Sequence, residues 1–495
     1  MMKRRAAGFC GIDIGTQGVR VCILSAGGEV LGVGTAPLPR GQREGARHEQ
    51  QPTAWWPAVV AAIRAALAAA VEVEVQSVAL DATSGTVLVE APDGTSVGAA
   101  LMYDDARAIE QAVRAQAVGA DLWDGLGYRM QPAWALPKTV WLLENGAVRP
   151  GDRVVHQSDH VLRQLVGDRV ATDTSHALKT GCDLVAGTWP WDVLESLGVA
   201  PALLPDLVRP GTMLGEVGRE AARQSGLRLG TPVRAGMTDG CAAQIATGAL
   251  RPGSWSSALG TSLVVKGCTA ELVRDPGGAV YSHRHPDGAW LPGGASSTGA
   301  GALAAINPDG DAATFDALTG QADGLVPFPG VTYPLMGRGE RFPFVASDAE
   351  GFTAPEAETP AARFAAVCQG IAYVERLAYG VLRHLGAEVD GPVAFSGGAA
   401  RNGWWNQLRA DVLGRPALVP GTTEAAAGMA ILAAAGPGEL AETAGRMVRV
   451  ERRYEPDPER GERLRSGYER MVGTFVDRGW LSAAVADTVV AGRAA

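Results

Sequence analysis

Several features that mark well-known protein classes are missing from this sequence. Its six cysteines form no Cys-X-X-Cys pair, which argues against a zinc site or a disulfide framework and fits a reducing cytoplasm. There is no cluster of lysine and arginine, and the formal net charge is −9, so neither nucleic acid nor an anionic membrane is an expected partner. The most apolar helix candidate, residues 58–71, is interrupted by Arg64 and is too short to span a bilayer. A small ligand is the partner that remains.

Regular metal-ligand spacing is also missing. The polar residues closest to such a pattern are His156, Asp159, His160, Asp173 and His176. Their spacing does not match that of known metal sites. We interpret them as helix caps and hydrogen-bonded core groups, and we assign no metal to them.

The composition is that of a folded chain with more than one core. Apolar residues make up 46% of the 495 residues and charged residues 20%. A chain of this length exceeds what one ordinary core supports, so two domains of similar size are expected.

Two glycine-threonine turns, one in each half of the chain, share the pattern of apolar strand, turn and apolar strand. The turns are Gly15, Thr16 and Gln17 in the first half and Gly260, Thr261 and Ser262 in the second. Backbone N–H groups in such a turn can bind phosphate, and the threonine hydroxyl can add to them. Either turn alone is also compatible with a structural hairpin. Their repetition favours a duplicated domain with a nucleotide between the copies.

Two carboxylates are candidates for the chemistry. Asp13 precedes the first turn and could hold a hydrated Mg²⁺, whereas Ala258 occupies the corresponding position in the second copy. Asp239 lies among small residues and is followed by helix formers, so we expect it where a strand passes into a helix. We interpret Asp239 as the base that removes a proton from a sugar hydroxyl. A capping aspartate at a strand end is the alternative.

A third group of polar residues follows the buried strand predicted at residues 75–80. Asp81, Thr83 and Ser84 lie at the carboxyl end of that strand, where α/β sheets place ligand contacts. Short hydroxyls and a carboxylate suit the hydroxyl groups of a sugar. A polar turn between two strands explains the same residues equally well.

The last third of the chain contains a further strand, glycine and helix pattern. Adjacent glycines at Gly397 and Gly398 allow a flat adenine or a ribose to lie against the backbone, and Asn402 can hydrogen-bond its edge. Upstream, the sequence predicts a proline- and glycine-rich loop at Val326–Gly339 and a long helix at Pro360–Gly386. For Gly421–Ala430 we favour close helix packing.

These motifs together resemble the FGGY carbohydrate kinases, a family of the actin-like ATPase superfamily. The resemblance rests on the segments Gly11–Thr16, Gly236–Asp239, Gly260–Ser262 and Ser396–Asn402. It implies an α/β fold of two actin-like, ribonuclease H-like domains with a nucleotide and sugar cleft between them. The expected domains are 1–248, which binds the sugar, and 249–485, which binds the nucleotide.

Within that family the sequence is most similar to the D-ribulose kinases of cyanobacteria and plants. The residues that carry this similarity are Asp81–Leu88, Ser175–Lys179, Tyr281–His283, Trp290–Ser296 and Arg338–Pro343. Bacterial xylulose kinases have Gln-Met-His-Gly where this chain has Thr83–Thr86, and glycerol kinases have an Arg-Glu pair there.

The resemblance implies roles for the candidate residues. Asp13, Ser84 and Asp239 would contact the sugar, the two turns would hold phosphates, and Gly397, Gly398 and Asn402 would face adenosine. The expected activity is transfer of the γ-phosphate of ATP, with Mg²⁺, to the terminal hydroxyl of D-ribulose in the cytoplasm, and a homodimer is the assembly considered. The alternatives are xylulose or another ketose or polyol, a non-catalytic sugar or nucleotide sensor, and an ATPase of the chaperone type.

Overall fold

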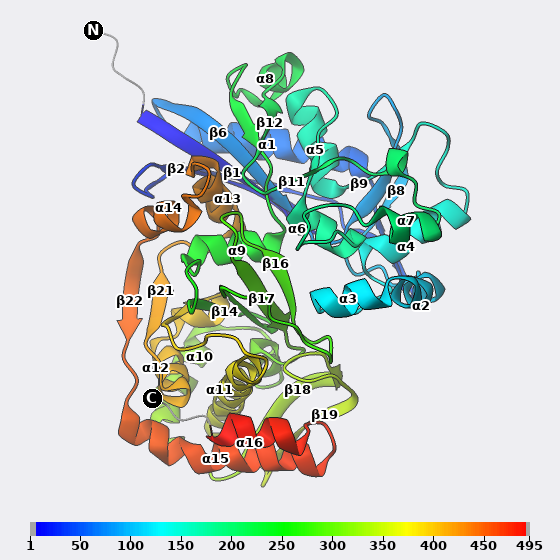
Figure 1. Cartoon of the computed structure of the whole chain (residues 1–495). Helices are drawn as coiled ribbons and strands as arrows, with labels where there is room; N and C mark the ends of the chain where they lie inside the picture. Colours follow the sequence, from blue (N-terminus) through cyan, green and yellow to red (C-terminus); the bar gives the residue numbers. More distant parts are fainter. Residues whose placement is uncertain (1–5, 492–495) are drawn as a thin grey trace. The chain divides into compact units, whose positions relative to one another are not determined.

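The computed structural model describes residues 6–491, which divide into two compact units (Figure 1). The first unit extends to Gly248 and also includes His283–Gly288 and Thr422–Arg449. The second contains Ala249–Ser282, Ala289–Gly421 and the chain from Val450 onward. The boundary at residue 248 stays a prediction, and the two later segments of the first unit lie outside it. Within residues 6–491, no helix is long and apolar enough to cross a membrane.

A six-stranded mixed sheet forms the centre of the first unit, in the order β12-β13-β6-β1-β2-β3. Its strands are β1 (Ala6–Ile14), β2 (Gly18–Ser25), β3 (Val30–Pro37), β6 (Val73–Ala82), β12 (Met213–Glu216) and β13 (Pro232–Arg234). Strands β1, β2 and β3 are antiparallel neighbours, whereas β6 and β13 run parallel to β1. The last residues of β1 and β6 are all buried, which is typical of central strands covered on both faces.

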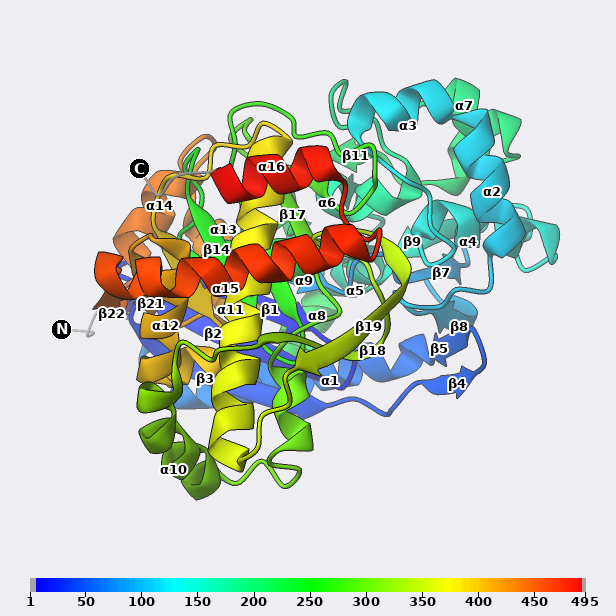
Figure 2. The ribbon, with the colours of Figure 1, turned by 90° about the horizontal axis from the view of Figure 1, so that it is seen from below.

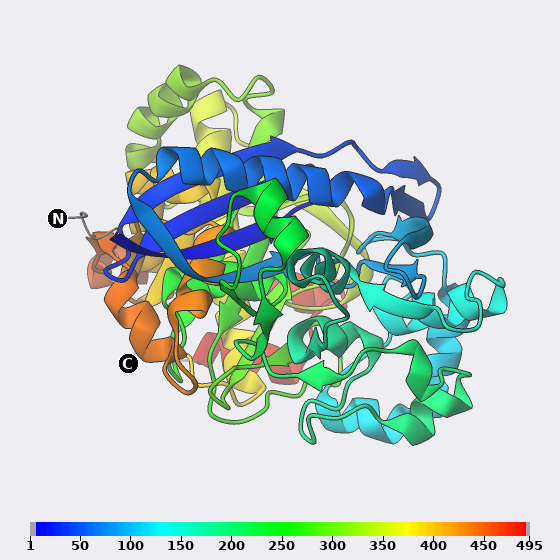
Figure 3. The same cartoon turned by 90° about the horizontal axis from the view of Figure 1, so that it is seen from above.

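Helices cover both faces of this sheet. Helix α1 (Trp55–Ala69) lies along β2 and β3 (Figure 3), and α13 (Ala425–Ala434) packs on β1, β6 and α9 (Asp239–Thr247). A Cβ atom at Gly11 would lie 1.8 Å from the carbonyl oxygen of Ala426, and one at Gly428 would lie 1.9 Å from that of Ala242. Only glycine permits these approaches, so the packing interpretation of Gly421–Ala430 is confirmed.

The rest of the first unit is built around a five-stranded sheet in the order β4-β5-β8-β7-β9. Its strands are β4 (Gln42–Glu44), β5 (Arg47–Gln50), β7 (Val87–Glu90), β8 (Ser96–Leu101) and β9 (Arg153–His156). The strands β10 (Thr172–Asp173) and β11 (Leu207–Val208) form a separate pair. The remaining helices of this unit are α2 (Ile109–Val118), α3 (Ala120–Leu126), α4 (Ala135–Glu144), α5 (Gln157–Val166), α6 (Thr174–Ala177), α7 (Trp191–Ser196), α8 (Arg219–Ser225) and α14 (Leu440–Met447).

The expected helix caps are present in this region. His156 and Asp159 form a capping box at the start of α5, and the carboxylate of Asp173 accepts hydrogen bonds from two backbone N–H groups of α6. His176 hydrogen-bonds Asp173 at 2.6 Å, and His160 hydrogen-bonds Glu90 at 2.7 Å. The interpretation of these residues as caps and hydrogen-bonded core groups is therefore confirmed.

The central sheet of the second unit repeats the strand order of the first. Its order is β16-β17-β15-β14-β20-β21-β22, with β14, β20 and β21 parallel and β15, β17 and β22 antiparallel to their neighbours. The strands are β14 (Trp255–Leu259), β15 (Leu263–Gly267), β16 (Tyr281–Arg284), β17 (Trp290–Ala295), β20 (Val393–Ser396), β21 (Ala417–Pro420) and β22 (Val450–Tyr454). From β3 to β12 in the first unit and from β17 to β22 in the second, three antiparallel strands are followed by two parallel strands and an antiparallel edge, and β16 is an additional edge strand of the second sheet. This repetition confirms the expected two-domain α/β fold.

Long helices pack beside this sheet. They are α10 (Ala312–Ala322), α11 (Pro360–His384), α12 (Gly403–Leu413), α15 (Pro458–Asp477) and α16 (Ala483–Ala491). Figure 2 shows α15 and α16 crossing α11, in agreement with their packing contacts. Helix α11 confirms the long helix predicted at residues 360–386.

The loop predicted at Val326–Gly339 is wrong for most of its length. Residues Val331–Glu340 form β18, which pairs with β19 (Ala346–Ala354) in a two-stranded sheet. Pro334 and the glycines suggested a loop, but β18 has only one strand neighbour. A strand with a free edge tolerates proline because the missing N–H group is not needed for a second neighbour.

Candidate functional site

Three carboxylates meet at the carboxyl ends of neighbouring parallel strands in the first unit. Asp13 on β1 is the register partner of Asp81 on β6, and Ala82 forms an isolated bridge with Thr238, which precedes Asp239. The exposed fraction is 5% for Asp13 and 0% for Asp81, whereas Asp239 is half-buried. The sheet therefore brings together the three carboxylates that the sequence singled out.

Burial and mutual repulsion govern the charge of this cluster. Burial raises the pKa of Asp13 above its ordinary value, although the nearby guanidinium of Arg20 opposes this effect. The pKa of Asp81 is raised much further, first by complete burial and then by the charges of Asp13 and Asp239. Asp81 is thus the member of the cluster that most readily holds a proton.

Asp239 lies where the sequence placed it, between β13 and a helix. It is the first residue of α9, whereas the N-cap position belongs to Thr238. The backbone N–H of Gly240 donates a 2.7 Å hydrogen bond to Oδ1 of Asp239. The N–H of Thr238 in turn donates to the hydroxyl of Ser175 at 3.2 Å, and that hydroxyl lies 3.1 Å from Nδ1 of His283. The start of α9, and with it Asp239, is anchored by buried polar contacts.

The loop between β6 and β7 carries the predicted sugar-binding hydroxyls, and the structure distinguishes between them. The hydroxyl of Thr83 contacts that of Thr86 at 2.6 Å and donates to Oε1 of Gln157 at 2.9 Å. The buried hydroxyl of Ser84 has no hydrogen-bond partner among the described residues, and neither carboxyl oxygen of Asp81 has one. Ser84 and Asp81 therefore retain hydrogen-bonding capacity for a ligand, whereas Thr83 maintains the loop.

Two lysines that the sequence did not identify as site residues hold this loop in place. The fully buried ammonium of Lys138 donates to the carbonyl oxygens of Gly85 at 2.6 Å and Met102 at 2.8 Å, and Lys179 donates to that of Ser84 at 3.0 Å. Burial lowers the pKa of Lys138 to about 7. No local sequence signal connects a helix lysine with a carbonyl group 53 positions away.

The acidic cluster is compatible with magnesium. No group of three or more His, Cys, Asp and Glu side chains is placed to hold a metal ion by itself between residues 6 and 491. Carboxylate oxygens are nevertheless preferred Mg²⁺ ligands, and Asp13 is a carboxylate of the cluster whose charge is supported by a guanidinium, that of Arg20. Mg²⁺ commonly keeps several waters and binds only one or two carboxylates plus substrate phosphates. Asp13 fits that donor set, and its Oδ2 also accepts a 3.1 Å hydrogen bond from Arg20.

The first predicted phosphate turn connects β1 and β2. The N–H of Gly15 donates to the carbonyl oxygen of Gly18 at 3.0 Å, which closes the hairpin. The carbonyl oxygens of Thr16 and Gln17 accept hydrogen bonds from Gln50 and Leu38. The turn directly follows Asp13 on the same strand.

The second turn borders a cavity of about 670 Å³ in the second unit. Gly260 and Thr261 lie between β14 and β15 and line this cavity, whereas Ser262 is not among its lining residues. The carbonyl oxygens of Gly260 and Thr261 accept hydrogen bonds from Ala300 and Gly301. We call this space the nucleotide pocket, after the ligand that the sequence motifs predict for it.

The third predicted motif forms another wall of the nucleotide pocket. Gly398 and Asn402 line it, and Gly397, at φ +80°, makes the turn out of β20 without lining the cavity. Asn402 is the N-cap of α12, where its Oδ1 accepts a hydrogen bond from Trp405 N–H and its Nδ2 donates to Thr319 at 2.8 Å. In this arrangement the side chain of Asn402 shapes the wall of the pocket.

Part of the nucleotide pocket was missed by the sequence interpretation. Phe315, Asp316 and Thr319 of α10 line it, together with Trp404 and Arg401. Helix α10 has no glycine-rich or phosphate-binding motif that would have revealed its role. It contributes because it packs against α11 in the folded unit.

The family of the chain follows from comparison with known proteins. A model of the N-terminal domain of the FGGY family of carbohydrate kinases matches residues 9–246, and a model of the C-terminal domain of the same family matches residues 256–436. Together they cover well over half of the chain, so the chain belongs to the FGGY family of carbohydrate kinases. It is a carbohydrate kinase, an enzyme that phosphorylates a sugar with ATP.

The similarity to individual proteins extends over nearly the full length, in sequence for the first protein below and in fold for the two solved structures. The chain is 29% identical over 477 residues to the xylulose kinase of Streptomyces rubiginosus, with 94% of this chain and 95% of that protein covered. Its structure is similar to that of a xylulose kinase from Rhodospirillum rubrum, with a TM-score of 0.84, 23% identity and coverage of 95% of this chain and 99% of that chain. A Plasmodium falciparum glycerol kinase solved with ADP has a TM-score of 0.81 at 15% identity, with 96% and 99% covered.

Proposed function

We propose that this enzyme is a ketopentose kinase that transfers the γ-phosphate of ATP to the terminal hydroxyl of D-xylulose. The observation that carries the proposal is the meeting of Asp13, Asp81 and Asp239 at three neighbouring strand ends. The choice of sugar rests on the similarity to xylulose kinases. It replaces D-ribulose, the sugar favoured by the sequence motifs alone, as the first candidate.

Asp239 acts as the general base in this mechanism. The hydrogen bond from Gly240 N–H to Oδ1 orients the carboxylate, and Oδ2 accepts the proton of the attacking hydroxyl. Because Asp239 is the first residue of α9, the positive end of the helix dipole lies beside its carboxylate. Ser84 and Asp81, with their unpartnered oxygens, bind further hydroxyls of the sugar.

Each unit contributes groups of its own to phosphate binding in this proposal. Asp13 would hold Mg²⁺ through water, and the bound ion would supply positive charge to the phosphates. The N–H of Gly260 donates to the carbonyl oxygen of Ser262, so the N–H of Thr261 is the donor of this turn that binds phosphate, and adenosine lies against Gly398 in the nucleotide pocket. Each of these roles is part of the proposal.

D-Ribulose is the second candidate because of one specific feature. The loop at Thr83–Thr86 lacks the Gln-Met-His-Gly segment of bacterial xylulose kinases, and the hydroxyls of Thr83 and Thr86 hydrogen-bond each other. The loop that carries Ser84 therefore differs in its side chains from that of bacterial xylulose kinases. This difference is a reason to expect a preference for a sugar of different stereochemistry.

A sugar panel tests the proposal directly. ADP release by the purified protein with MgATP is measured with D-xylulose, D-ribulose, L-ribulose, L-xylulose, sedoheptulose, ribitol and glycerol, against a control without sugar. The highest kcat/KM for D-xylulose supports the proposal. The highest value for D-ribulose would favour the second candidate and keep the mechanism. Sugar and nucleotide binding without ADP release would instead identify a non-catalytic sensor.

A further inference from the structure

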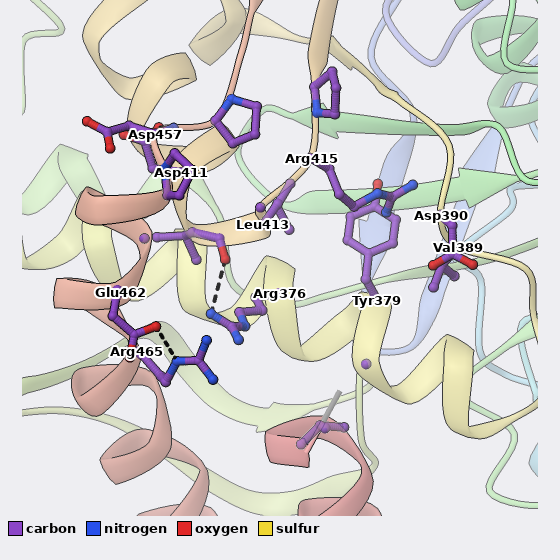
Figure 4. Close-up of a pocket in the computed structure, with 18 of the residues that line it drawn as sticks. Arg376, Tyr379, Val389, Asp390, Asp411, Leu413, Arg415, Asp457, Glu462 and Arg465 are labelled. Carbon is purple, nitrogen blue, oxygen red and sulfur yellow. Dashed lines mark hydrogen bonds and ion pairs between the residues drawn. The ribbon is translucent and has the colours of Figure 1, made fainter. Parts of the chain in front are cut away.

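A second large cavity of the second unit has a lining rich in arginine. Its volume is about 600 Å³, and it lies between α11, the loop after α12 and the start of α15 (Figure 4). Its charged lining residues are Arg376, Arg383, Arg415, Arg465, Asp390, Asp411, Asp457 and Glu462. We call it the arginine cavity. It shares no lining residue with the nucleotide pocket.

Two of the four arginines have carboxylate partners and two do not. Arg383 pairs with Asp390 at 2.8 Å, and Arg465 hydrogen-bonds Glu462 at 2.9 Å. Within residues 6–491, no carboxylate oxygen lies within the 4.0 Å limit of an ion pair from Arg376 or Arg415. The cavity thus contains two arginines without a direct ion pair in the described chain, although the charges of Asp390 and Glu375 act on Arg415 from a longer distance and that of Glu469 acts on Arg376.

Arg415 is the stronger indication of a ligand because it is 91% buried. Its guanidinium lies over the ring of Tyr379, 4.7 Å from the centroid, and its Nε donates to the carbonyl oxygen of Gly391 at 2.9 Å. Its Nη1 has no hydrogen-bond partner among the described residues, and neither has the hydroxyl of Tyr379. An unpaired buried charge with an unused donor is costly unless something else binds it.

The guanidinium of Arg376 is held by contacts of the same kind. Arg376 lies one helical turn before Tyr379 on α11. Its Nη1 donates to the carbonyl oxygen of Val412 at 3.2 Å, and its guanidinium lies 4.5 Å from the ring centroid of Tyr468. Burial lowers the pKa of both guanidiniums below the ordinary value, yet arginine stays protonated in proteins. Aromatic stacking and carbonyl contacts fix both groups in position but supply no negative charge.

The opposite side of the cavity is acidic. Figure 4 shows Asp411 and Asp457 at one end and Arg415 with Tyr379 at the other. Oδ1 of Asp411 accepts hydrogen bonds from Gln407 and from Asp457 N–H, whereas its Oδ2 has no hydrogen-bond partner in the described chain and forms a longer ion pair with Arg460 at 3.5 Å. A ligand that matches both ends carries an anionic group for the arginines and hydroxyl donors for the carboxylates.

We propose that the arginine cavity is a second ligand site that binds a phosphate monoester of a small polyhydroxylated compound. The phosphate contacts Arg415, Arg376 and the hydroxyl of Tyr379, and the hydroxyls of the ligand donate to Asp411 and Asp457. Guanidinium groups bind phosphate oxygens with paired hydrogen bonds, and a volume of about 600 Å³ is within the range of small-molecule sites. The site goes beyond the kinase function and does not depend on which sugar is phosphorylated.

Direct binding to the full-length protein tests the site. Ribose 5-phosphate, inorganic phosphate, ribose and citrate are titrated calorimetrically at fixed ionic strength. We expect ribose 5-phosphate to bind at least about tenfold more tightly than inorganic phosphate, since only the ester carries hydroxyls for the acidic end. Equal affinity of the two phosphates, tighter binding of citrate, or no binding of ribose 5-phosphate would overturn the proposal.

Arginine variants locate the binding. Arg415→Gln and Arg376→Gln should each weaken ribose 5-phosphate binding at least about tenfold. Arg401→Gln in the nucleotide pocket and Arg363→Gln on α11 are the controls and should bind as the wild type does. Circular dichroism shows whether each variant folds. If Arg415→Gln does not fold, Arg376→Gln still tests the site, because Arg376 is only half-buried and its substitution should disturb folding less. Loss of binding in Arg401→Gln with retention in Arg376→Gln would place the phosphate in the nucleotide pocket and overturn the proposal.

Discussion

The ammonium group of Lys138 donates a 2.6 Å hydrogen bond to the carbonyl oxygen of Gly85, and both groups are fully or nearly fully buried. Gly85 directly follows Ser84, whose carbonyl oxygen is held by Lys179. The conformation of the proposed sugar-binding loop therefore depends on two lysines that need not touch the sugar.

We expect Lys138→Met to raise the KM for the sugar more than it lowers kcat. The substitution removes the donor of two buried carbonyl oxygens, which costs about 1–3 kcal/mol of unfolding free energy and loosens the loop that carries Ser84. Steady-state kinetics with the preferred sugar and urea unfolding give the two quantities. Thr139→Val is the matched control because Thr139 is a buried residue of the same helix whose hydroxyl bonds only Ala135. An unchanged sugar KM in Lys138→Met would contradict the positioning role.

The pH dependence of the unfolding free energy should also reveal the titration of the Lys138 amine. Its folded-state pKa of about 7 is below the value near 10.4 expected in the unfolded chain. Between these values the unfolded state binds the proton and the folded state does not, so stability rises with pH by up to ~1.4 kcal/mol per unit. Below pH 7 both states are protonated, and the cost of burying the charge is present in full. A neutral amine still has two N–H groups, one for each carbonyl oxygen.

The measurement is the difference in unfolding free energy between the wild type and Lys138→Met from pH 6 to pH 10. The difference cancels titrations common to both proteins. The charged groups that affect Lys138 are Lys179, Asp105, Asp104 and Arg107, and none of them is altered. The wild type should gain stability relative to the variant as pH rises above 7. A difference that stays flat, or that falls, would show that Lys138 keeps its proton in the folded protein.

The role of Asp239 predicts a separation of binding from turnover. Asp239→Asn keeps the size of the side chain and the hydrogen bond from Gly240, but an amide cannot accept the proton. We expect kcat to fall by about 10²–10⁴-fold, with little change in the affinity for ADP. Asp168→Asn, at an exposed residue of the same unit, is the control for loss of one carboxylate. Full activity of Asp239→Asn would exclude it as the base.

Local sequence patterns predicted much of this site because the backbone conformation at each motif is determined by residues that are neighbours in the sequence. Asp239 was expected at a strand-to-helix junction from its small neighbours and the helix formers that follow, and that is where it lies. The repeated turns at Gly15 and Gly260 likewise indicated a duplicated sheet, and both sheets have the same strand order. These features depend on residues that are close together in the sequence.

Contacts between distant segments could not be predicted in this way. Lys138 reaches a carbonyl group 53 positions earlier, and α13 returns to the first unit after the chain has formed most of the second. Thr83 was expected to bind sugar, but its hydroxyl is used by Thr86 and Gln157. Only tertiary packing determines which polar atoms are left for a ligand.

Two adjacent glycines give the last prediction, because they should respond differently to substitution. Gly397 has φ +80°, and a Cβ atom there would lie 2.6 Å from the carbonyl oxygen of Leu259, so Gly397→Ala should cost about 1–3 kcal/mol of stability. At Gly398 the nearest atom to a Cβ would be 3.8 Å away, on the side chain of Arg401. Gly398 lines the nucleotide pocket, so Gly398→Leu should fold normally and fill part of that pocket.

The expected result for Gly398→Leu is ADP affinity at least about tenfold weaker than in the wild type, because the leucine side chain occupies space that the nucleotide needs. Urea unfolding and calorimetric titration with ADP measure stability and affinity on the same samples. Gly473→Leu, at a glycine of α15 with open space around its Cβ position and outside the nucleotide pocket, is the control. If Gly398→Leu binds ADP as tightly as the control does, the nucleotide does not lie against this backbone segment, and the assignment of the pocket is wrong.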